Sequence, residues 1–155
     1  MSELNIVTKK NNNETQFIIF SIGKEYYGID IARINNIMMV PKITFLPGAP
    51  EYYSGIINLR GHIVPIMSLR RRMGISDDEL TKESRIIILN LENGELMGII
   101  VDSVKEVLTI SDNDIEPPSS VLEKELNFIH GIGKKNEEII SICAIDAIVD
   151  DSLVS

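Results

Sequence analysis

The side chains that could do acid–base or nucleophilic chemistry are few and scattered. His62 and His130 each stand beside a glycine at an expected strand edge, where an exposed turn residue is the ordinary interpretation. Cys143 lies in the apolar segment IISICAI, with no cationic neighbour in sequence to activate its thiol, so we expect it to be buried and inert. The sequence contains no nucleophile elbow, phosphate loop or dinucleotide fingerprint. We therefore predict no catalytic residue, no metal site and no cofactor.

Charged side chains gather in short runs that we interpret as solvated turns. The carboxylate pairs Asp77–Asp78 and Glu137–Glu138 lie in polar segments, as surface residues do. Three consecutive arginines follow an expected strand end, namely Arg70, Arg71 and Arg72. They could bind an anion, but a solvated turn is the preferred interpretation.

The short polar insert Asn58-Leu59-Arg60-Gly61 separates two apolar runs and is the stretch best suited to recognition. Asn58 can fix a tight turn through the nearby backbone, and Gly61 allows a conformation that other residues resist. Arg60 offers a planar fork of donors that suits a carboxylate or carbonyl on a partner. From the residues alone, two interpretations stay open. Arg60 is either an ordinary turn residue or a contact residue held up to a protein partner.

Composition narrows the class of protein. The chain has 155 residues, 44% of them hydrophobic, and a formal net charge of −8. This length suits one core of good size or two small ones. The acidic balance argues against nucleic acid as a partner, because phosphate contacts need Lys and Arg. A single cysteine, a polar N-terminus and short apolar runs lead us to expect a cytoplasmic protein without direct membrane insertion.

Short apolar runs separated by turn signals predict the fold. Residues 1–14 are expected to be a mobile tail, and hairpins are expected around Gly23-Lys24 and Asn93-Gly94. Asp30 is expected to cap a short helix carrying apolar residues at helical spacing, and Asp146 to cap a closing helix. Nine or ten short strands without alternating long helices favour a mainly all-β fold of antiparallel sheets. We expect two small five-stranded barrels, over about residues 15–80 and 81–150.

The segment GIINLRGHIVPIMSL resembles the Gly-x-x-Asn-Leu-Arg-Gly-x-x-x-Pro signature of the CheW family of chemotaxis coupling proteins. The resemblance continues through EYYGIDIARINNIM, ITFLPGAPEYYSGIINLRG, MGIIVDSVKEVLTI and FIHGIG, and covers about residues 15–150. It implies two barrels of the Src-homology-3-like type and a non-catalytic adaptor. The implied partners are the regulatory domain of the histidine kinase CheA and the cytoplasmic tip of methyl-accepting chemoreceptors, in membrane-associated arrays.

The resemblance also implies roles for individual residues. Kinase-facing positions are matched by Ile34, Asn36, Ile37 and Arg60, and more loosely by Ser120 and Val121. Receptor-facing positions are matched by Arg60, Ile63, Ile86 and Met97, and the structural turn by Gly55, Asn58 and Gly61.

Two residues depart from the family pattern: Asn36 replaces a frequent Glu, and Ser68 replaces the usual Asp. The same domain also occurs fused to a receiver domain and as the tail of CheA, but we expect a standalone adaptor that is monomeric when free. A small-molecule-binding β-barrel or an enzyme of unknown class is the alternative.

Overall fold

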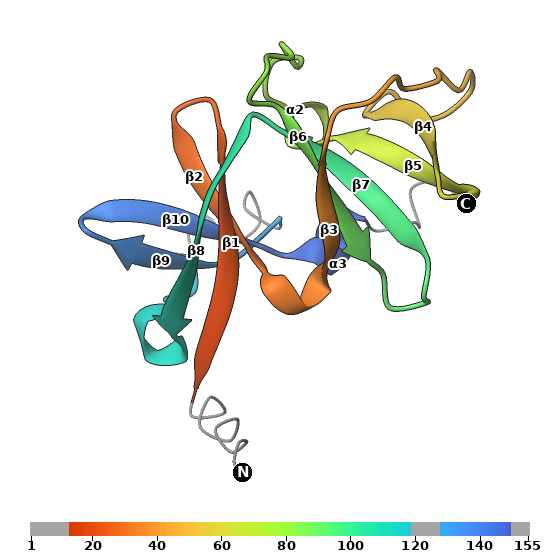
Figure 1. Cartoon of the computed structure of the whole chain (residues 1–155). Helices are drawn as coiled ribbons and strands as arrows, with labels where there is room; N and C mark the ends of the chain where they lie inside the picture. Colours follow the sequence, from red (N-terminus) through yellow and green to blue (C-terminus); the bar gives the residue numbers. More distant parts are fainter. Residues whose placement is uncertain (1–12, 119–127, 150–155) are drawn as a thin grey trace.

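Ten short strands form two five-stranded sheets in the computed structural model, which describes residues 13–118 and 128–149 (Figure 1). Sheet A has the order β8-β1-β2-β10-β9 and consists of β1 (Glu14–Ile22), β2 (Glu25–Asp30), β8 (Ser103–Ser111), β9 (Ile129–Lys135) and β10 (Glu138–Cys143). Sheet B has the order β3-β6-β7-β5-β4 and consists of β3 (Ile34–Met39), β4 (Tyr53–Leu59), β5 (His62–Ser68), β6 (Arg85–Asn90) and β7 (Leu96–Val101). The predicted fold class, mainly β with two five-stranded units, is confirmed.

Three details of the predicted layout are wrong. Sheet B is continuous in sequence, whereas sheet A joins two N-terminal strands to three C-terminal ones, so the sheets do not divide at about residue 80. Each sheet contains one parallel pair, β2 with β10 and β5 with β7. Other strands lie between the two members of each pair in sequence, so no tight hairpin forces them to be antiparallel. Glu14 already belongs to β1 rather than to a tail, and residues 1–12 lie outside the described part of the chain.

The helix expected after Asp30 is only one turn long. Asp30 does cap this turn, η1 (Ile31–Arg33), because its carboxylate accepts a hydrogen bond from the backbone N–H of Ala32 at 2.9 Å. From Ile34 onward the expectation is wrong, since the chain forms β3 and pairs antiparallel with β6. Isoleucine and asparagine are poor helix formers, so pairing in the sheet overrides the helical spacing of the apolar residues.

Both faces of the inner strands β1, β6 and β7 are buried, because each sheet contacts its own core on one face and a shared core on the other. In β6, for example, Ile86 and Ile88 point into the core of sheet B, whereas Ile87 and Leu89 point into the shared central core. The central core also contains Phe20 from sheet A. The alternation of side chains along a strand thus explains why the sequence shows continuous apolar runs.

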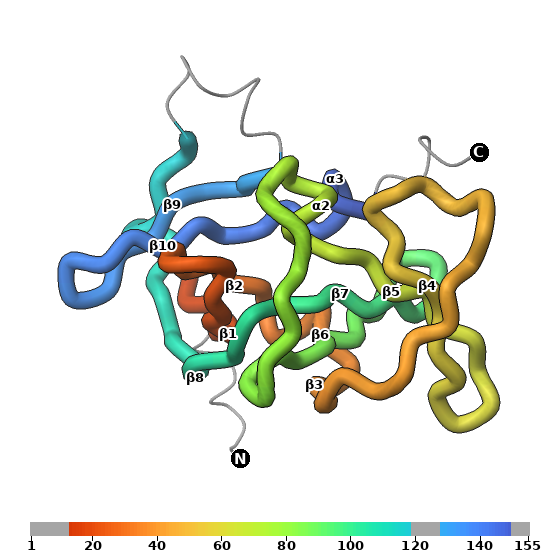
Figure 2. Tube along the Cα trace, turned by 90° about the horizontal axis from the view of Figure 1, so that it is seen from above, coloured from red at the N-terminus to blue at the C-terminus, as the bar shows by residue number. Residues whose placement is uncertain are grey.

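The two sheets repeat one another. The hairpin β4–β5 is followed by α2 (Leu69–Arg72), and the hairpin β9–β10 by α3 (Ile145–Ile148), which begins 76 residues later at position 145 instead of 69. An isolated bridge lies beside each hairpin, joining Thr44 to Ile56 in sheet B and Glu116 to Ile132 in sheet A; Ile56 and Ile132 follow the offset of 76 residues, whereas Thr44 and Glu116 are 72 residues apart. Seen from above, the sheets lie next to each other with α2 and α3 near their boundary (Figure 2).

Arg72 joins the two repeats and is not the solvated turn residue that we expected. Its Nε donates to the backbone oxygen of Ile148, at the end of α3, over 2.8 Å. Its guanidinium lies 4.7 Å from the ring centre of Tyr52 and 4.8 Å from that of Phe128. Tyr52 and Phe128 are themselves matched residues, each accepting a backbone hydrogen bond from the residue before its helix, Ser68 or Ala144. Arg72 therefore contributes cation–π and hydrogen-bonding contacts across the boundary.

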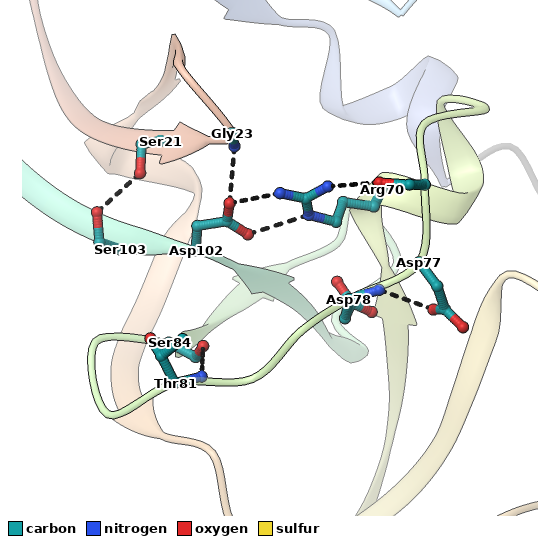
Figure 3. A network of polar contacts seen from close by, with 10 residues as sticks. Ser21, Gly23, Arg70, Asp77, Asp78, Thr81, Ser84, Asp102 and Ser103 are labelled. Carbon is teal, nitrogen blue, oxygen red and sulfur yellow. Dashed lines mark hydrogen bonds and ion pairs between the residues drawn. The ribbon is translucent and has the colours of Figure 1, made fainter.

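Arg70 and Arg71 are also paired with carboxylates. Nε and an Nη of Arg70 donate to the two carboxylate oxygens of Asp102, over 3.2 and 2.7 Å (Figure 3). Asp102 also accepts from the backbone N–H of Gly23 at 2.7 Å, so this network ties sheet B to the β1–β2 turn of sheet A. Arg71 pairs with Asp77 at 2.8 Å. The expectation of a solvated arginine run is wrong because these side chains connect separate segments.

Carboxylates near the sheet boundary also differ from the predicted pattern. Asp77 is exposed as expected, but Asp78 is half-buried, and burial raises the pKa of its carboxyl against the opposing effect of the Ser68 hydroxyl. Asp146 does not cap α3. The cap position belongs to Ala144, and Asp146 lies in the first turn, where it pairs with Arg33 at 3.1 Å.

Candidate protein-binding site

The turn between β4 and β5 has the geometry that its residues predict. The backbone N–H of Gly61 donates to Oδ1 of Asn58 at 2.8 Å, which fixes the turn from within. Arg60 and Gly61 both have positive φ, +52° and +86°, as a two-residue hairpin turn of the mirror-image type requires. The Arg60 side chain is exposed at the tip. Asn58 and Gly61 therefore form the turn together with Arg60.

Arg60 occupies a backbone conformation that costs energy. Residues other than glycine, asparagine and aspartate rarely adopt the left-handed region, where the cost is roughly 1 kcal/mol. The matched hairpin β9–β10 carries Asn136 at the same place, with φ of +51°. Asparagine tolerates this conformation, and arginine has no comparable local advantage. Glu137, the next residue of that hairpin, also has a positive φ of +72°, so strain by itself does not mark a contact residue; Arg60 differs in placing an exposed cation beside the groove described below.

A groove of about 1140 Å³ opens beside this hairpin. Strands β5 and β7 pair in parallel only from Ile66 and Gly98 onward, so their earlier residues separate. One side of the groove is the start of β5, residues 62–65, and the other is the β6–β7 hairpin, residues 90–97. Ile63 is 62% exposed, whereas Met97 is 2% exposed and belongs to the central core. The groove therefore has a mixed polar and apolar lining at the end of sheet B that carries Arg60, and Ile63 is its exposed large apolar side chain.

The structure brings together only part of the predicted receptor-facing set. Ile63 and Met97 line the same groove, and Arg60 lies at the tip of the adjoining hairpin. Ile86 is wrong as a contact residue, because it is fully buried in the core of sheet B and faces away from solvent. In β6 the side chains alternate between two cores, so neither face of this strand is available for a partner.

The predicted kinase-facing residues lie on β3, an edge strand of sheet B. Ile34 and Ile37 are half-buried and pack against the central core, so only part of each side chain is accessible. Oδ1 of Asn36 is buried without a hydrogen-bond partner among the described residues. Ser120 and Val121 lie outside the described residues.

Gly55 is structural, but it is not in a turn as predicted. It lies within β4 beside a register shift, with φ of +147°, and a side chain there would meet the backbone of Thr44. Ser68, the departure from the family pattern, caps α2 by accepting a hydrogen bond from the backbone N–H of Arg71 at 3.2 Å. Aspartate and serine are both good caps, so this substitution preserves the local structure.

The groove includes residues that sequence reasoning missed. They come from the β6–β7 loop and from the ends of other segments, namely Asn35, Tyr53, Glu92, Glu95, Leu96 and Val149. The Asn93-Gly94 turn signal placed the hairpin correctly. The signal that could have identified a groove wall is the length of the loop, five residues between Asn90 and Leu96.

The described residues show no arrangement suited to catalysis. His62 and His130 are exposed, and burial raises the pKa of the Cys143 thiol to about 12, so the thiol is inert as predicted. Within residues 13–118 and 128–149, no group of three or more His, Cys, Asp or Glu side chains is placed to hold a metal ion. Among the same residues, no helix has the length and apolar character needed to cross a bilayer.

This chain is similar to known chemotaxis proteins in both sequence and fold. The chain matches the CheW-like domain over residues 16–153. It is 33% identical over 144 residues to the chemotaxis protein CheW of Helicobacter pylori, covering 92% of this chain and 87% of the relative. It is 32% identical over 136 residues to CheW of Bacillus subtilis, covering 87% and 86%.

A solved structure agrees with this assignment. The scaffolding protein TtCheW from Thermoanaerobacter tengcongensis superposes with a TM-score of 0.80 at 39% identity, covering 86% of each chain. The chain belongs to the CheW family, whose members are non-catalytic scaffold proteins of chemotaxis. The predicted absence of enzymatic activity agrees with this family.

Proposed function

We propose that this protein is an adaptor that couples methyl-accepting chemoreceptors to the histidine kinase CheA in bacterial chemotaxis arrays. Its membership of a family of chemotaxis scaffold proteins supports this role. The observation that carries the proposal is Arg60, an exposed guanidinium that the chain keeps at a strained turn position beside the groove. A hairpin that served only to reverse the chain would carry asparagine or glycine there, as the β9–β10 hairpin does with Asn136.

Two neighbouring surfaces divide the partners. The regulatory domain of the kinase binds the β3 edge through the accessible parts of Ile34, Asn36 and Ile37, together with Arg60. The cytoplasmic tip of the receptor binds in the groove against Ile63, and Met97, which is buried beneath the groove, supports this surface from the central core. Both surfaces belong to sheet B, where β3 is one edge strand and β4 is the other, and Asn35 of β3 also lines the groove. The Ser120 and Val121 region stays a prediction for a second kinase-facing surface. The free protein is a cytoplasmic monomer that joins the membrane-associated receptor arrays through its partners.

Isothermal titration calorimetry tests the kinase contact. The full chain is titrated with the isolated regulatory domain of the CheA-type kinase from the same organism, and Arg60→Asn is measured alongside. The wild type should bind in the micromolar range or tighter. Because interface arginines are frequent hot spots, the variant should bind roughly tenfold or more weakly. Asn is the matched residue of the other hairpin, so it keeps the turn intact.

The same titration with the soluble cytoplasmic fragment of a chemoreceptor separates the two surfaces. If Arg60→Asn weakens only kinase binding, Arg60 belongs to the kinase surface; if it weakens only receptor binding, it belongs to the groove. Binding of neither partner by the folded wild-type protein would contradict the adaptor role. Unchanged binding of both partners by Arg60→Asn would contradict the role of Arg60.

A further inference from the structure

Among the described residues, this groove lies at one of two equivalent places in the molecule. Sheet A has the same strand order at its β1–β2 hairpin, where β2 runs parallel to β10 as β7 runs parallel to β5. The β1–β2 connection, however, has only two residues, Gly23 and Lys24, whereas Leu91–Glu95 form the β6–β7 connection. The longer loop extends past the start of β7 and supplies one wall of the groove. That wall is therefore an addition to the repeated architecture.

The added wall is acidic. Glu92 and Glu95 line the groove and are both exposed, and neither forms an ion pair with another described residue. Asp146 also lines the groove, but Arg33 neutralises it at 3.1 Å. The described groove lining includes no lysine or arginine. Two uncompensated negative charges thus lie along one side of the groove.

The hairpin that supplies the opposite side carries a positive charge at its tip, just outside the groove lining. Because β5 and β7 run in the same direction, the β4–β5 tip and the β6–β7 tip lie at the same end of sheet B. Arg60 stands at the first tip, and it forms no ion pair with the described residues. An apolar segment lying between the tips would therefore meet a cation on one flank and two carboxylates on the other.

We infer that the groove selects a helix by the charges on both flanks of its apolar face. The segment that fits has lysine or arginine on the flank facing Glu92 and Glu95, and carboxylate or carbonyl groups on the flank facing Arg60. Such a pattern fixes which way the helix runs, because turning it end for end would exchange the flanks and place like charges together. Complementary charges of this kind contribute mainly to specificity and to the rate of association. The inference rests on the proposed function, since it takes the receptor tip as the helix.

Charge reversal on the added wall provides the test. The full chain, Glu92→Lys/Glu95→Lys and Glu92→Gln/Glu95→Gln are titrated with the soluble cytoplasmic receptor fragment at low and high salt. The matched control is Glu25→Lys/Glu106→Lys, which makes the same change in net charge at exposed positions of sheet A. Because like charges across an interface oppose binding, the Lys variant should bind roughly tenfold more weakly at low salt, and the Gln variant about threefold. The control should stay within about twofold of the wild type.

A receptor fragment whose basic tip residues are changed to Glu should show the reverse preference, binding the Lys variant more tightly than the wild type. The inference is overturned if the Lys variant binds as tightly as the wild type, or if the control weakens binding equally. Either of these results leaves the proposed function standing, because the wild type still binds. Failure of the wild type to bind the receptor fragment overturns the inference together with the receptor half of the proposed function.

Discussion

The hairpins β4–β5 and β9–β10 have nearly the same backbone and different surfaces. Their turns share positive φ values, +52° and +86° at Arg60 and Gly61 against +51° and +72° at Asn136 and Glu137. Each carries an exposed isoleucine at the same place, Ile63 at 62% and Ile139 at 60% exposure. Only the first has an arginine at its tip and a long neighbouring loop. The fold thus supplies two equivalent hairpins, which we call platforms: β4–β5 in sheet B and β9–β10 in sheet A. Different side chains and one longer neighbouring loop form a groove beside the β4–β5 platform.

The largest expected difference between the platforms is the loss of stability when a glycine in the first strand of each hairpin is changed to alanine. Gly55 in β4 has φ of +147° and is packed against the Thr44 backbone, so Gly55→Ala adds strain and a clash that cannot relax by a side-chain movement. We expect a loss of about 3 kcal/mol in the free energy of unfolding. Gly131, its counterpart, has no positive φ, but a side chain there would meet Cγ2 of the β-branched Ile115 at 2.6 Å and the backbone oxygen of Glu116 at 3.2 Å. Because Gly131→Ala adds a clash but no backbone strain, it should cost less, about 2 kcal/mol.

Urea unfolding followed by circular dichroism measures both variants. If both variants lost the same free energy of unfolding, the two glycines would be equally constrained, which would contradict the difference in their backbone conformations and contacts.

The next difference concerns two ion pairs. The second residue of α2 is an arginine and the second residue of α3 is an aspartate, and each pairs with a residue of opposite charge. Arg70 of α2 pairs with Asp102 through two contacts, and Asp146 of α3 pairs with Arg33 through one. The side chains of the first pair are 14% and 29% exposed, against 26% and 63% for the second. We expect Asp102→Asn to cost about 2 kcal/mol, because it leaves a largely buried guanidinium short of its partner. Asp146→Asn should cost about 0.5 kcal/mol or less.

The pH dependence separates these two pairs further. Burial alone would raise the pKa of Asp102, but the hydrogen bonds from Arg70 and Gly23 outweigh it and hold the pKa below its usual range. A carboxyl with a lowered folded-state pKa stabilises the protein above its unfolded pKa, and this stabilisation is lost as the pH falls through the folded value. The stability gap between wild type and Asp102→Asn should therefore be constant near neutral pH and shrink below about pH 4. A gap that widens in acid would contradict the pairing.

The sequence predicted the fold class well, because turn chemistry and apolar runs report local structure. Asn58 and Gly61 marked the turn between β4 and β5, and the Asn93-Gly94 signal marked the β6–β7 hairpin. The order in which the strands pair could not be predicted from the sequence. Nothing local in the strands indicates that β10 pairs with β2 rather than with a nearer strand, so the contiguous division at residue 80 was wrong. The one-turn helix at Ile31 was overestimated because its apolar spacing suits β3 equally well.

The candidate site was only partly predictable for a related reason. Ile63, which the resemblance predicted to face the receptor, is exposed and lines the groove, and its contact with a receptor stays a prediction. Ile86 was misplaced because its burial depends on the curvature of sheet B around its own core, which involves strands far apart in sequence. Arg70 and Arg72 were misread as solvated because their partners, Asp102 and the end of α3, lie 32 and 76 residues away.

A third prediction compares the exposed isoleucines as binding residues. Ile63 lines the groove, so Ile63→Asp places a charge on its apolar surface and should weaken binding of the soluble receptor fragment roughly tenfold or more. Ile139→Asp makes the same change on the hairpin without a groove, and binding should stay within about twofold of the wild type. Both side chains are exposed, so neither variant should lose the fold. Isothermal titration with both variants decides whether one platform or two engage the receptor, and equal losses would show that both do.

The smallest expected effect is the most informative about Arg60. Arg60→Asn copies the residue at the matched position, Asn136, and relieves a left-handed conformation that arginine adopts at a cost. We expect the variant to be more stable by about 0.5 kcal/mol, because asparagine tolerates this region. The reciprocal change, Asn136→Arg, should lower the stability by a similar amount. Chemical unfolding of the two variants in parallel measures these differences, and their opposite signs serve as an internal control.

If both exchanges left the stability unchanged, arginine would carry no strain at this turn, and the argument from strain to function would lose its basis. A gain in stability together with a loss of partner binding would show that the chain keeps a less stable turn for the sake of the contact that Arg60 makes.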